Sequence, residues 1–329
     1  MKAVAFNEFG DVNVLREVDM PVPKAAGSDI LVKIWASGVN PIDYKMRTVN
    51  MGIFSGEKVL GYDGVGQVIE AGEDVVGVQV GDEVMFAGDW TRNGTNAEYC
   101  LVDHRLVGPK PKSLTAPQAA SLPLVVITAW EGIVECMHVG EEDKGKWLLA
   151  LPGAGGVGSM VIQLAKLFGL RVVATASRDI TVKWCETLGA DHVINHKSPL
   201  KEQLTALGIT GVDYIFNAFP LENNYAQYVD ILLPLGHIVN IDSAGALDQL
   251  PLFLKRASLS HELMFARPQY GVQPEKQGAI LRKVAALVDD GKIKPITTRE
   301  MPFSLEGVKD AHLHMLSRNA CGKTVLCMP

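Results

Sequence analysis

The sequence predicts an α/β protein in which a doubly wound parallel sheet accompanies a separate β-rich domain. A glycine-rich turn near the middle of the chain lies between an apolar, strand-like run and a helix-like segment. Strand and helix patterns then alternate as far as about residue 260, which is typical of parallel sheets. The first 120 or so residues differ, because short alternating runs are separated by glycines, as in compact all-β units.

The β-rich domain is expected to span residues 1–123. Residues 31–36 and 65–70 alternate apolar and polar side chains, as half-buried strands do. Four prolines mark the exit from this domain: Pro109, Pro111, Pro117 and Pro123. A chain of 329 residues is long for one compact core, so a second domain is expected to follow.

The parallel-sheet domain is expected to span residues 124–262. A buried helix at 124–134 leads into it, and strands are predicted at 147–151, 171–176, 193–194, 212–216 and 236–241. After about residue 260 the pattern changes. Helices are predicted at 277–290 and 304–316, followed by a last strand at 322–326.

The glycine-rich turn matches the spacing G-x-G-x-x-G at Gly153, Gly155 and Gly158. A strand precedes it, and a helix at 159–168 and a second strand follow within roughly 30 residues, the context of a dinucleotide-binding turn. The helix N-terminus offers unpaired N–H groups to a pyrophosphate. The predicted contacts are Gly153, Ala154, Gly155, Gly156, Val157 and Gly158. An ordinary strand-to-helix turn that binds nothing is the alternative.

The residues after the second strand favour NADPH over NADH. NAD-binding units usually place Asp or Glu about 20 residues past the first glycine, where it binds the ribose hydroxyls. Here Ser177 and Arg178 come first, and a guanidinium can pair with a 2′-phosphate. Asp179 follows directly, so an NADH site stays open as an alternative.

The bulk composition excludes several classes of protein. A net charge of −6 without a basic run argues against nucleic-acid binding. No stretch is expected to cross a membrane, and the first residues lack a signal-peptide core. Five scattered cysteines without C-x-x-C spacing indicate free thiols in a reducing compartment. We therefore expect a cytoplasmic protein.

Several different motifs follow one another along the chain. They are residues 37–43 (SGVNPID), 60–66 (LGYDGVG), 80–84 (VGDEV), the pairs Ala119-Ala120 and Thr128-Ala129, the glycine turn, 188–191 (LGAD) and 322–325 (GKTV). Together they resemble the medium-chain dehydrogenase/reductase superfamily, and within it the zinc-independent quinone oxidoreductase-like branch. The resemblance implies a GroES-like catalytic domain that residues 263–329 complete, a Rossmann domain inserted between its parts, and a homodimer.

The resemblance also indicates that no metal is bound. Zinc-dependent members carry a cysteine and then a histidine as early ligands, and Asn40 and Tyr62 stand at those positions here. Neither side chain is a normal zinc ligand. The four-cysteine structural zinc lobe has no counterpart, because only a short polar loop separates Val84 from Tyr99.

Without a metal, the resemblance implies hydride transfer from NADPH to a quinone or an α,β-unsaturated carbonyl. The developing enolate needs hydrogen-bond donors and then a proton. Asn40, Tyr44 and Tyr62 are the candidate catalytic residues, because Asn40 and Tyr44 lie in the loop that faces the nicotinamide in relatives. Ring packing by both tyrosines, and a loop-shaping role for Asn40, are the alternatives. Many quinone reductases carry their tyrosine one place later, at Lys45 here, so substrate class does not carry over directly.

Four further residues are implied as cofactor contacts. Thr128 corresponds to a turn near the nicotinamide in relatives, and Asn217 ends a predicted strand at the edge where ligands dock. His196 falls where some relatives place an aromatic side chain near the 2′-phosphate, and Asn319 precedes the final Gly-Lys pair. Helix packing for Thr128 and a solvated loop position for His196 are the alternatives.

Two rival functions stay open beside reduction of a small-molecule quinone or conjugated carbonyl. One is reduction of enoyl thioesters by an enzyme of the same superfamily. The other is NADPH binding for a structural or sensing role without turnover.

Overall fold

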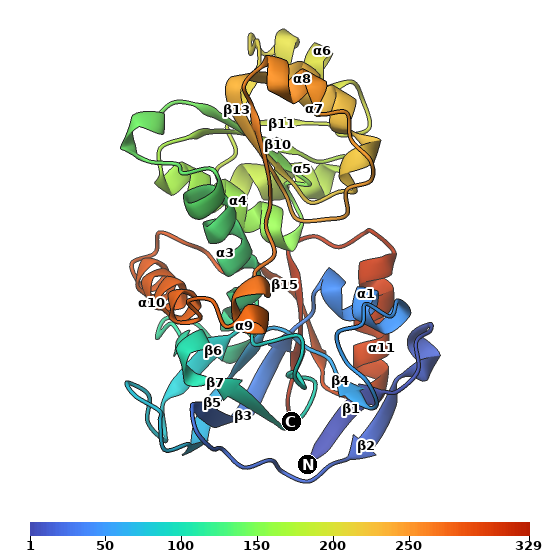
Figure 1. Ribbon diagram of the computed structural model, residues 1–329, viewed down its shortest axis with the longest axis vertical. Coiled ribbons are helices and arrows are strands. Elements are labelled where there is room, and N and C mark those ends of the chain that lie inside the picture. Colours follow the sequence, from blue (N-terminus) through green and yellow to red (C-terminus); the bar gives the residue numbers. More distant parts are fainter. The chain divides into compact units, whose positions relative to one another are not determined.

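The computed structural model describes residues 1–329 and divides them into two compact units. The first unit contains Met1–Ile127 together with Phe265–Pro329, and the second contains Thr128–Met264. The sequence pattern placed these transitions at residues 123 and 262. Both ends of the chain lie in the first unit (Figure 1).

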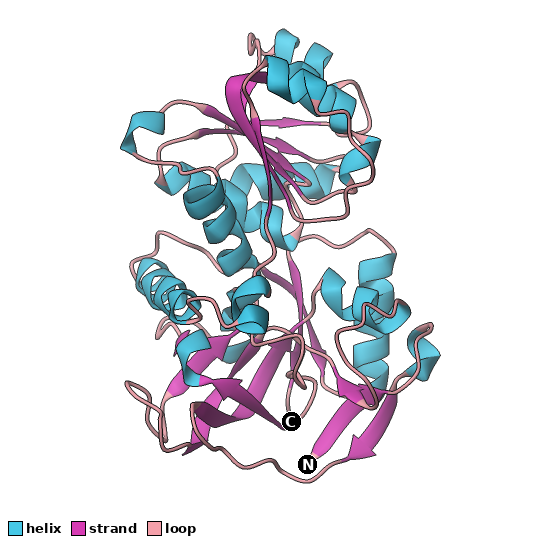
Figure 2. Ribbon diagram, viewed as in Figure 1, coloured by secondary structure: helices cyan, strands magenta, loops and turns pink.

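The first unit is rich in strands and carries helices around its sheets (Figure 2). Its strands are β1 (Lys2–Phe6), β2 (Arg16–Asp19), β3 (Asp29–Gly38), β4 (Lys58–Val59), β5 (Gly64–Ala71), β6 (Glu83–Phe86), β7 (Tyr99–Asp103), β8 (Gly108–Pro109), β15 (Thr297–Pro302) and β16 (Lys323–Cys327). Its helices are α1 (Pro41–Thr48), α2 (Ala116–Ala119), α9 (Ala266–Tyr270), α10 (Glu275–Asp289) and α11 (Leu305–Leu316). Helix α3 (Pro123–Trp130) leads to the second unit.

Two sheets organise the first unit. The larger has the order β15-β16-β3-β5-β6-β8, with β7 also paired to β3, and the smaller has the order β2-β1-β4. Alternate residues of β3, Ile30, Val32 and Ile34, are buried in one apolar cluster, as the period of a strand requires. The C-terminal strand β16 runs antiparallel to β3, with Val325 opposite Gly38, so the end of the chain lies beside the segment that follows β3.

The second unit is a six-stranded parallel sheet with helices on both faces (Figure 2). The strand order is β11-β10-β9-β12-β13-β14. These strands are β9 (Trp147–Leu151), β10 (Arg171–Thr175), β11 (His192–Ile194), β12 (Val212–Asn217), β13 (Leu232–Asn240) and β14 (Ser258–His261). The helices are α4 (Gly156–Leu167), α5 (Asp179–Thr187), α6 (Leu200–Ala206), α7 (Tyr225–Ile231) and α8 (Leu250–Leu254). This doubly wound arrangement confirms the predicted fold class.

Two local expectations differ from the structure. Residues 41–48 form helix α1 and not a loop, because Pro41 suits the first helical turn and the Asp43 carboxylate accepts the Asn40 N–H at 2.7 Å. The buried helix expected at 124–134 is α-helical only to Trp130, and Glu131–Cys136 continue as a π-helical turn.

One apolar segment, Ala116–Cys136, is long and apolar enough to cross a membrane by length and composition, contrary to the expectation from sequence. However, 83% of its 18-residue window is buried inside the protein, as in the core helix of a folded domain. It is also divided among α2, α3 and the π-helical turn.

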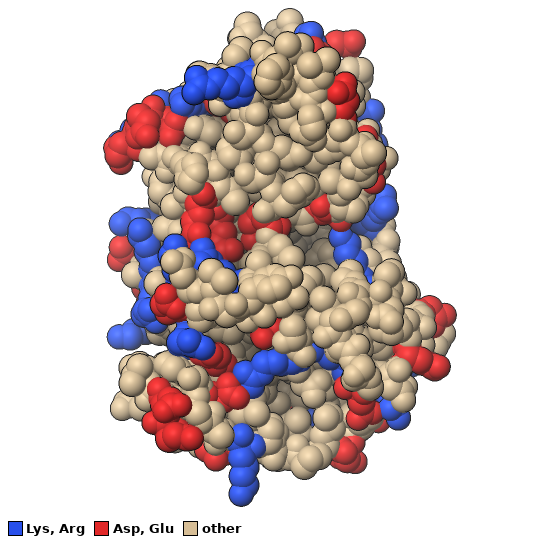
Figure 3. All heavy atoms as spheres, viewed as in Figure 1, with Lys and Arg blue, Asp and Glu red and all other residues tan.

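On the face drawn in Figure 3, basic and acidic side chains are interspersed. All five cysteines are free thiols.

Candidate active site

The glycine turn of the second unit joins β9 to α4 in a conformation that only small residues allow. A Cβ atom on Gly158 would lie 1.9 Å from the carbonyl oxygen of Pro152, and one on Gly153 would lie 2.7 Å from the Cβ of Ala174. Gly158 is therefore required for close packing of backbone on backbone, and Gly153 for close packing against the side chain of Ala174. Gly153 also donates its N–H to the Thr175 carbonyl at 2.9 Å, which ties the turn to β10.

Gly155 has a different role in the same turn. It is the N-cap residue of α4, with φ −73° and ψ 172°, and no side chain caps the helix. A Cβ atom there would meet only Pro152, at 3.6 Å and beyond, so internal packing does not demand glycine. The uncapped N–H groups at this helix start could bind an anion, and a bare backbone would let a pyrophosphate approach closely. Together with Ala154, Gly156 and Val157, the turn fits a dinucleotide.

The segment after β10 carries the residues predicted to select the cofactor. Ser177 and Arg178 are half-buried, and Asp179 is exposed as the first residue of α5. The backbone N–H of Arg178 donates to the Thr181 hydroxyl at 3.2 Å, and that hydroxyl donates to the Arg178 carbonyl at 2.7 Å. These two bonds hold the backbone of Arg178 at the start of α5, next to the carboxyl end of β10.

His196 follows β11 at the same edge of the sheet. Its ring packs against Phe219 with 5.5 Å between centroids, and its Nδ1 atom is buried without a partner within the protein. Burial lowers the pKa of His196, so the neutral ring is favoured. His196 is therefore half-buried against Phe219, and a fully solvated loop position is excluded.

Asn217 lies at the carboxyl end of β12, but its side chain is committed to other residues. Its Nδ2 atom donates to the Asn240 side chain at 2.7 Å and to the Phe219 carbonyl at 2.7 Å, and its Oδ1 atom accepts from Tyr228 at 2.9 Å. Asn217 is fully buried. We therefore assign it a role in joining β12 to β13. No pattern in the sequence indicated the contribution of Asn240.

The two remaining predicted cofactor contacts lie in different units. Thr128 is the first residue of the second unit and is buried within α3. Asn319 is an exposed residue of the first unit, in the segment between α11 and β16, and its backbone N–H donates to the Ser317 hydroxyl at 3.3 Å.

The three predicted catalytic side chains all belong to the first unit and differ sharply in accessibility. Tyr62 is fully buried, and its hydroxyl donates to the sulfur of Met46 at 3.3 Å. Asn40 is 1% exposed. Tyr44, in the first turns of α1, is half-buried, and its hydroxyl makes no hydrogen bond within the protein. Of the three groups, the phenol of Tyr44 is the one left available to a ligand.

Asn40 is the centre of a buried polar network that the sequence did not predict. Its Nδ2 atom donates to Asp63 at 2.6 Å, and its Oδ1 atom accepts from Lys323. Asp43 accepts the N–H groups of Asn40 and Gly61, at 2.7 and 3.0 Å. Burial raises the pKa of Asp43 to about 7, against the lowering effect of those bonds and of Lys323. Burial likewise raises the pKa of Asp63, and Lys323 opposes the rise.

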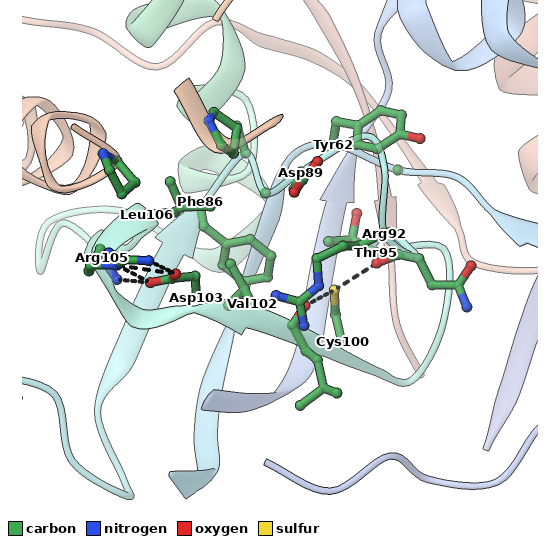
Figure 4. Close-up of a pocket in the computed structure, with 18 of the residues that line it drawn as sticks. Tyr62, Phe86, Asp89, Arg92, Thr95, Cys100, Val102, Asp103, Arg105 and Leu106 are labelled. Carbon is green, nitrogen blue, oxygen red and sulfur yellow. Dashed lines mark hydrogen bonds and ion pairs between the residues drawn. The ribbon is translucent and has the colours of Figure 1, made fainter. Parts of the chain in front are cut away.

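Aromatic rings pack around Tyr62. Its ring meets Phe265 edge to face at 5.2 Å, and Phe265 stacks on Trp90 at 5.0 Å and 8°. Trp90 donates its indole N–H to Gln269 at 2.8 Å. A cavity of about 80 Å³ lies beside them, with Tyr62 and the Arg105–Asp103 ion pair toward opposite ends (Figure 4). The rings thus pack the short loop after β6, where the sequence resemblance implied the absence of a structural zinc lobe.

The zinc that the sequence resemblance implies for zinc-dependent relatives does not fit these residues. At the two early ligand positions, the oxygen of Asn40 already accepts from an ammonium and the hydroxyl of Tyr62 is turned toward a thioether. No group of three or more His, Cys, Asp or Glu side chains lies close enough to hold a metal ion. Carboxamide and phenol oxygens are poor zinc ligands in any case.

Comparison with known proteins agrees with this architecture. Residues 26–112 match the family model of the alcohol dehydrogenase GroES-like domain, and residues 156–272 match that of the zinc-binding dehydrogenases. A zinc-type alcohol dehydrogenase-like protein of Staphylococcus epidermidis is 37% identical over 99% of both chains. The 2-methylene-furan-3-one reductase of Solanum lycopersicum is 32% identical, over 99% of this chain and 79% of its own.

A solved structure shares the fold as well. A mycobacterial protein in complex with NADPH superposes with a TM-score of 0.86 at 25% identity, covering 99% of each chain. The fold and the glycine turn define a nucleotide-binding dehydrogenase. The chain belongs to the medium-chain dehydrogenase/reductase superfamily, a family of oxidoreductases with quinone and enone reductases among its members.

Proposed function

We propose that the protein is an NADPH-dependent, zinc-independent reductase of quinones or α,β-unsaturated carbonyls. The observation that carries this proposal is the pair of early ligand positions, where Asn40 and Tyr62 cannot replace cysteine and histidine. A relative at 32% identity is named for reduction of a 2-methylene-furan-3-one, a conjugated enone, which supports the choice of acceptor. The structural neighbour in complex with NADPH supports the choice of cofactor.

The proposal is tested by NADPH consumption with metal-stripped enzyme and a panel of acceptors. Quinones and enones are expected to be reduced in preference to saturated aldehydes, because hydride addition to a conjugated acceptor spreads the developing charge into an enolate or hydroquinone oxygen that a hydrogen-bond donor can stabilise without a metal. Enoyl thioesters belong in the panel, since their exclusive reduction would favour the thioester alternative. Activity restored only by zinc, with simple aldehydes, would refute the proposal.

Arg178 is proposed to select NADPH by pairing with its 2′-phosphate. The Arg178→Ala variant is expected to bind NADPH about 10- to 100-fold more weakly, because a charge-assisted hydrogen bond contributes about 1.5–3 kcal/mol. NADH lacks the phosphate, so its affinity should stay unchanged. Titration of cofactor fluorescence measures both constants. Lys201→Ala, at an exposed ion pair with Asp230, is the control. Equal weakening of both cofactors would exclude this role for Arg178.

Tyr44 is proposed to donate the hydrogen bond, and then the proton, that the reduced acceptor requires. Bound NADPH supplies the hydride, and the negative charge that develops on the acceptor oxygen needs a donor. The unpartnered phenol of Tyr44 can provide it. The hydroxyl of Tyr62 is already used within the protein, so we assign Tyr62 to packing.

The two tyrosines give a matched pair of variants. Tyr44→Phe is expected to lower kcat about 100-fold or more, the usual contribution of a positioned general acid, with little change in NADPH affinity. Tyr62→Phe removes only a buried contact with sulfur and should keep kcat within a few fold. Steady-state kinetics on the best acceptor of the panel distinguishes them. The reverse order of effects would transfer the proton-donating role to Tyr62.

A further inference from the structure

A buried ion pair in the first unit joins segments that lie far apart in the sequence. Lys323, at the start of β16, is 3% exposed, and Asp63, shortly after β4, is fully buried. The Nζ atom of Lys323 lies 2.7 Å from Oδ2 of Asp63 and also donates to Oδ1 of Asn40. Pairing of β16 beside β3 creates this contact, since the Val39 N–H donates to the Thr324 carbonyl at 3.0 Å.

The network fixes the orientation of the Asn40 carboxamide. Its oxygen faces the ammonium of Lys323, and its NH₂ group faces the carboxylate of Asp63. The reversed amide would set the NH₂ group against the ammonium and the oxygen against the carboxylate, and both contacts would be repulsive. Only one orientation is therefore compatible with the two charges.

Asn40 in turn determines where α1 begins. It is the N-cap residue of this helix, and its N–H donates to the Asp43 carboxylate in the first turn. Tyr44 follows Asp43 directly. The contacts therefore run from Lys323 through Asn40 to the helix that carries Tyr44.

The ammonium of Lys323 also stabilises the buried carboxylate of Asp63 directly. Its second oxygen accepts the Leu124 N–H at 2.6 Å, at the start of α3. A buried carboxylate left without its cation is strongly destabilising, even when hydrogen bonds remain. A divalent metal at Asn40 would have to displace the ammonium that already compensates Asp63.

We infer that Lys323 is a positioning residue. Its ammonium serves as an internal cation beside Asn40, the position at which zinc-dependent relatives carry a metal ligand. The ammonium balances the negative charge of Asp63 and fixes the orientation of the Asn40 carboxamide. It thereby fixes the position at which helix α1 begins. The kinetic part of this inference rests on the proposed function, whereas its stability and metal-binding parts do not.

Stability is tested with Lys323→Met, Asp63→Asn and the double variant. Each single change should lower the melting temperature, because it leaves one buried charge or dipole without its partner. The double variant removes both charges and is expected to be more stable than the sum of the two single losses predicts. The matched control is Lys201→Met with Asp230→Asn at an exposed ion pair, where the changes in melting temperature of the two single variants should add up to that of the double variant. Additive losses at Lys323 and Asp63 would overturn the inference.

Kinetics distinguish positioning from general structural damage. Lys323→Met is expected to lower kcat about 10- to 100-fold, the cost of a small misplacement of a catalytic group, while KM for NADPH stays within about twofold. Lys323→Arg keeps the charge and should recover a substantial part of the lost kcat. Unchanged kcat, or an equal loss in kcat and NADPH affinity, would overturn the positioning role. If Lys323→Met does not fold, the comparison uses Lys323→Met with Asp63→Asn.

The metal content of the protein completes the test. After dialysis against zinc, wild-type protein is expected to retain far less than one zinc ion per chain, and chelation should leave its activity unchanged. One tightly bound zinc ion per chain, whose removal abolishes activity, would overturn the inference that Lys323 is the internal cation. If no acceptor in the panel is reduced, the proposed function fails, but the melting temperatures and zinc content still decide this inference.

Discussion

Gly158→Ala is expected to destabilise the second unit by about 3 kcal/mol and to abolish measurable cofactor binding. The added Cβ would lie 1.9 Å from the Pro152 carbonyl oxygen, so the start of α4 must move away from the end of β9. Overpacking of this kind costs about 1–3 kcal/mol when side chains can yield, and here the obstacle is backbone. Thermal unfolding and a fluorescence titration with NADPH measure the two effects.

Gly155→Ala is the informative companion of this variant. Its Cβ would lie 3.6 Å from Pro152, at ordinary contact distance, and φ is −73°, so the fold should tolerate it. A poor N-cap residue costs about 1 kcal/mol at most here. NADPH affinity should nevertheless fall at least about tenfold, because the methyl group lies where a pyrophosphate would approach the backbone. Normal NADPH binding by Gly155→Ala would show that the turn is only structural.

Glu262→Gln is expected to stabilise the protein at neutral and alkaline pH. Glu262 follows β14 and is hydrogen-bonded to Glu131 of the π-helical turn, and both side chains are 7% exposed. One oxygen of Glu262 has no hydrogen-bond partner, and Glu135 adds a further negative charge nearby. Burial, and then the charge of Glu131, hold the pKa of Glu262 well above its usual range. The folded state therefore keeps a proton that the unfolded state releases.

The sign of the pH dependence follows from this difference. Above the ordinary glutamate pKa of 4.5, the folded protein binds more protons than the unfolded chain, so stability falls as pH rises toward the raised pKa. Glutamine carries no charge and can still donate to Glu131. The variant should therefore gain about 1–3 kcal/mol at pH 8, the usual cost of an unsatisfied buried group, and show a flatter stability profile.

Melting temperatures of wild type and variant between pH 5 and pH 8 provide the measurement. The two curves should converge toward pH 5 and separate as pH rises. Glu202→Gln, on the exposed surface of α6, is the control and should follow wild type throughout. Parallel curves for wild type and Glu262→Gln would mean that Glu262 is not protonated in the folded protein at these pH values.

The sequence predicted much of the fold because local patterns decide it. The run before Gly153, the spacing of the three glycines and the apolar period after them specify strand, turn and helix within one short stretch. Tyr44 was expected in a loop, and it lies instead in helix α1. Its start depends on an Asp43 carboxylate that also binds Gly61 from another segment, and such a contact leaves no periodic signal.

The candidate site was less predictable because burial and partners decide what a side chain can do. Asn40 and Tyr62 lie within recognised motifs and Tyr44 directly follows one, yet only the phenol of Tyr44 is left without a partner. Lys323 belonged to a recognised motif, but no feature of the sequence marked it as the partner of Asp63. That pair forms across 260 residues of chain.

The sequence by itself determined the α/β class, the glycine turn between β9 and α4, and the absence of cysteine and histidine at positions 40 and 62, since each is a property of residue identity and short-range order. The tertiary structure alone decided that Asn217 joins two strands, that Tyr62 packs against other rings, and that Lys323 meets Asp63. These outcomes depend on which segments are brought together and how far water is excluded. Both are set by long-range packing, which changes the energy of a charge or a hydrogen bond without changing the residue.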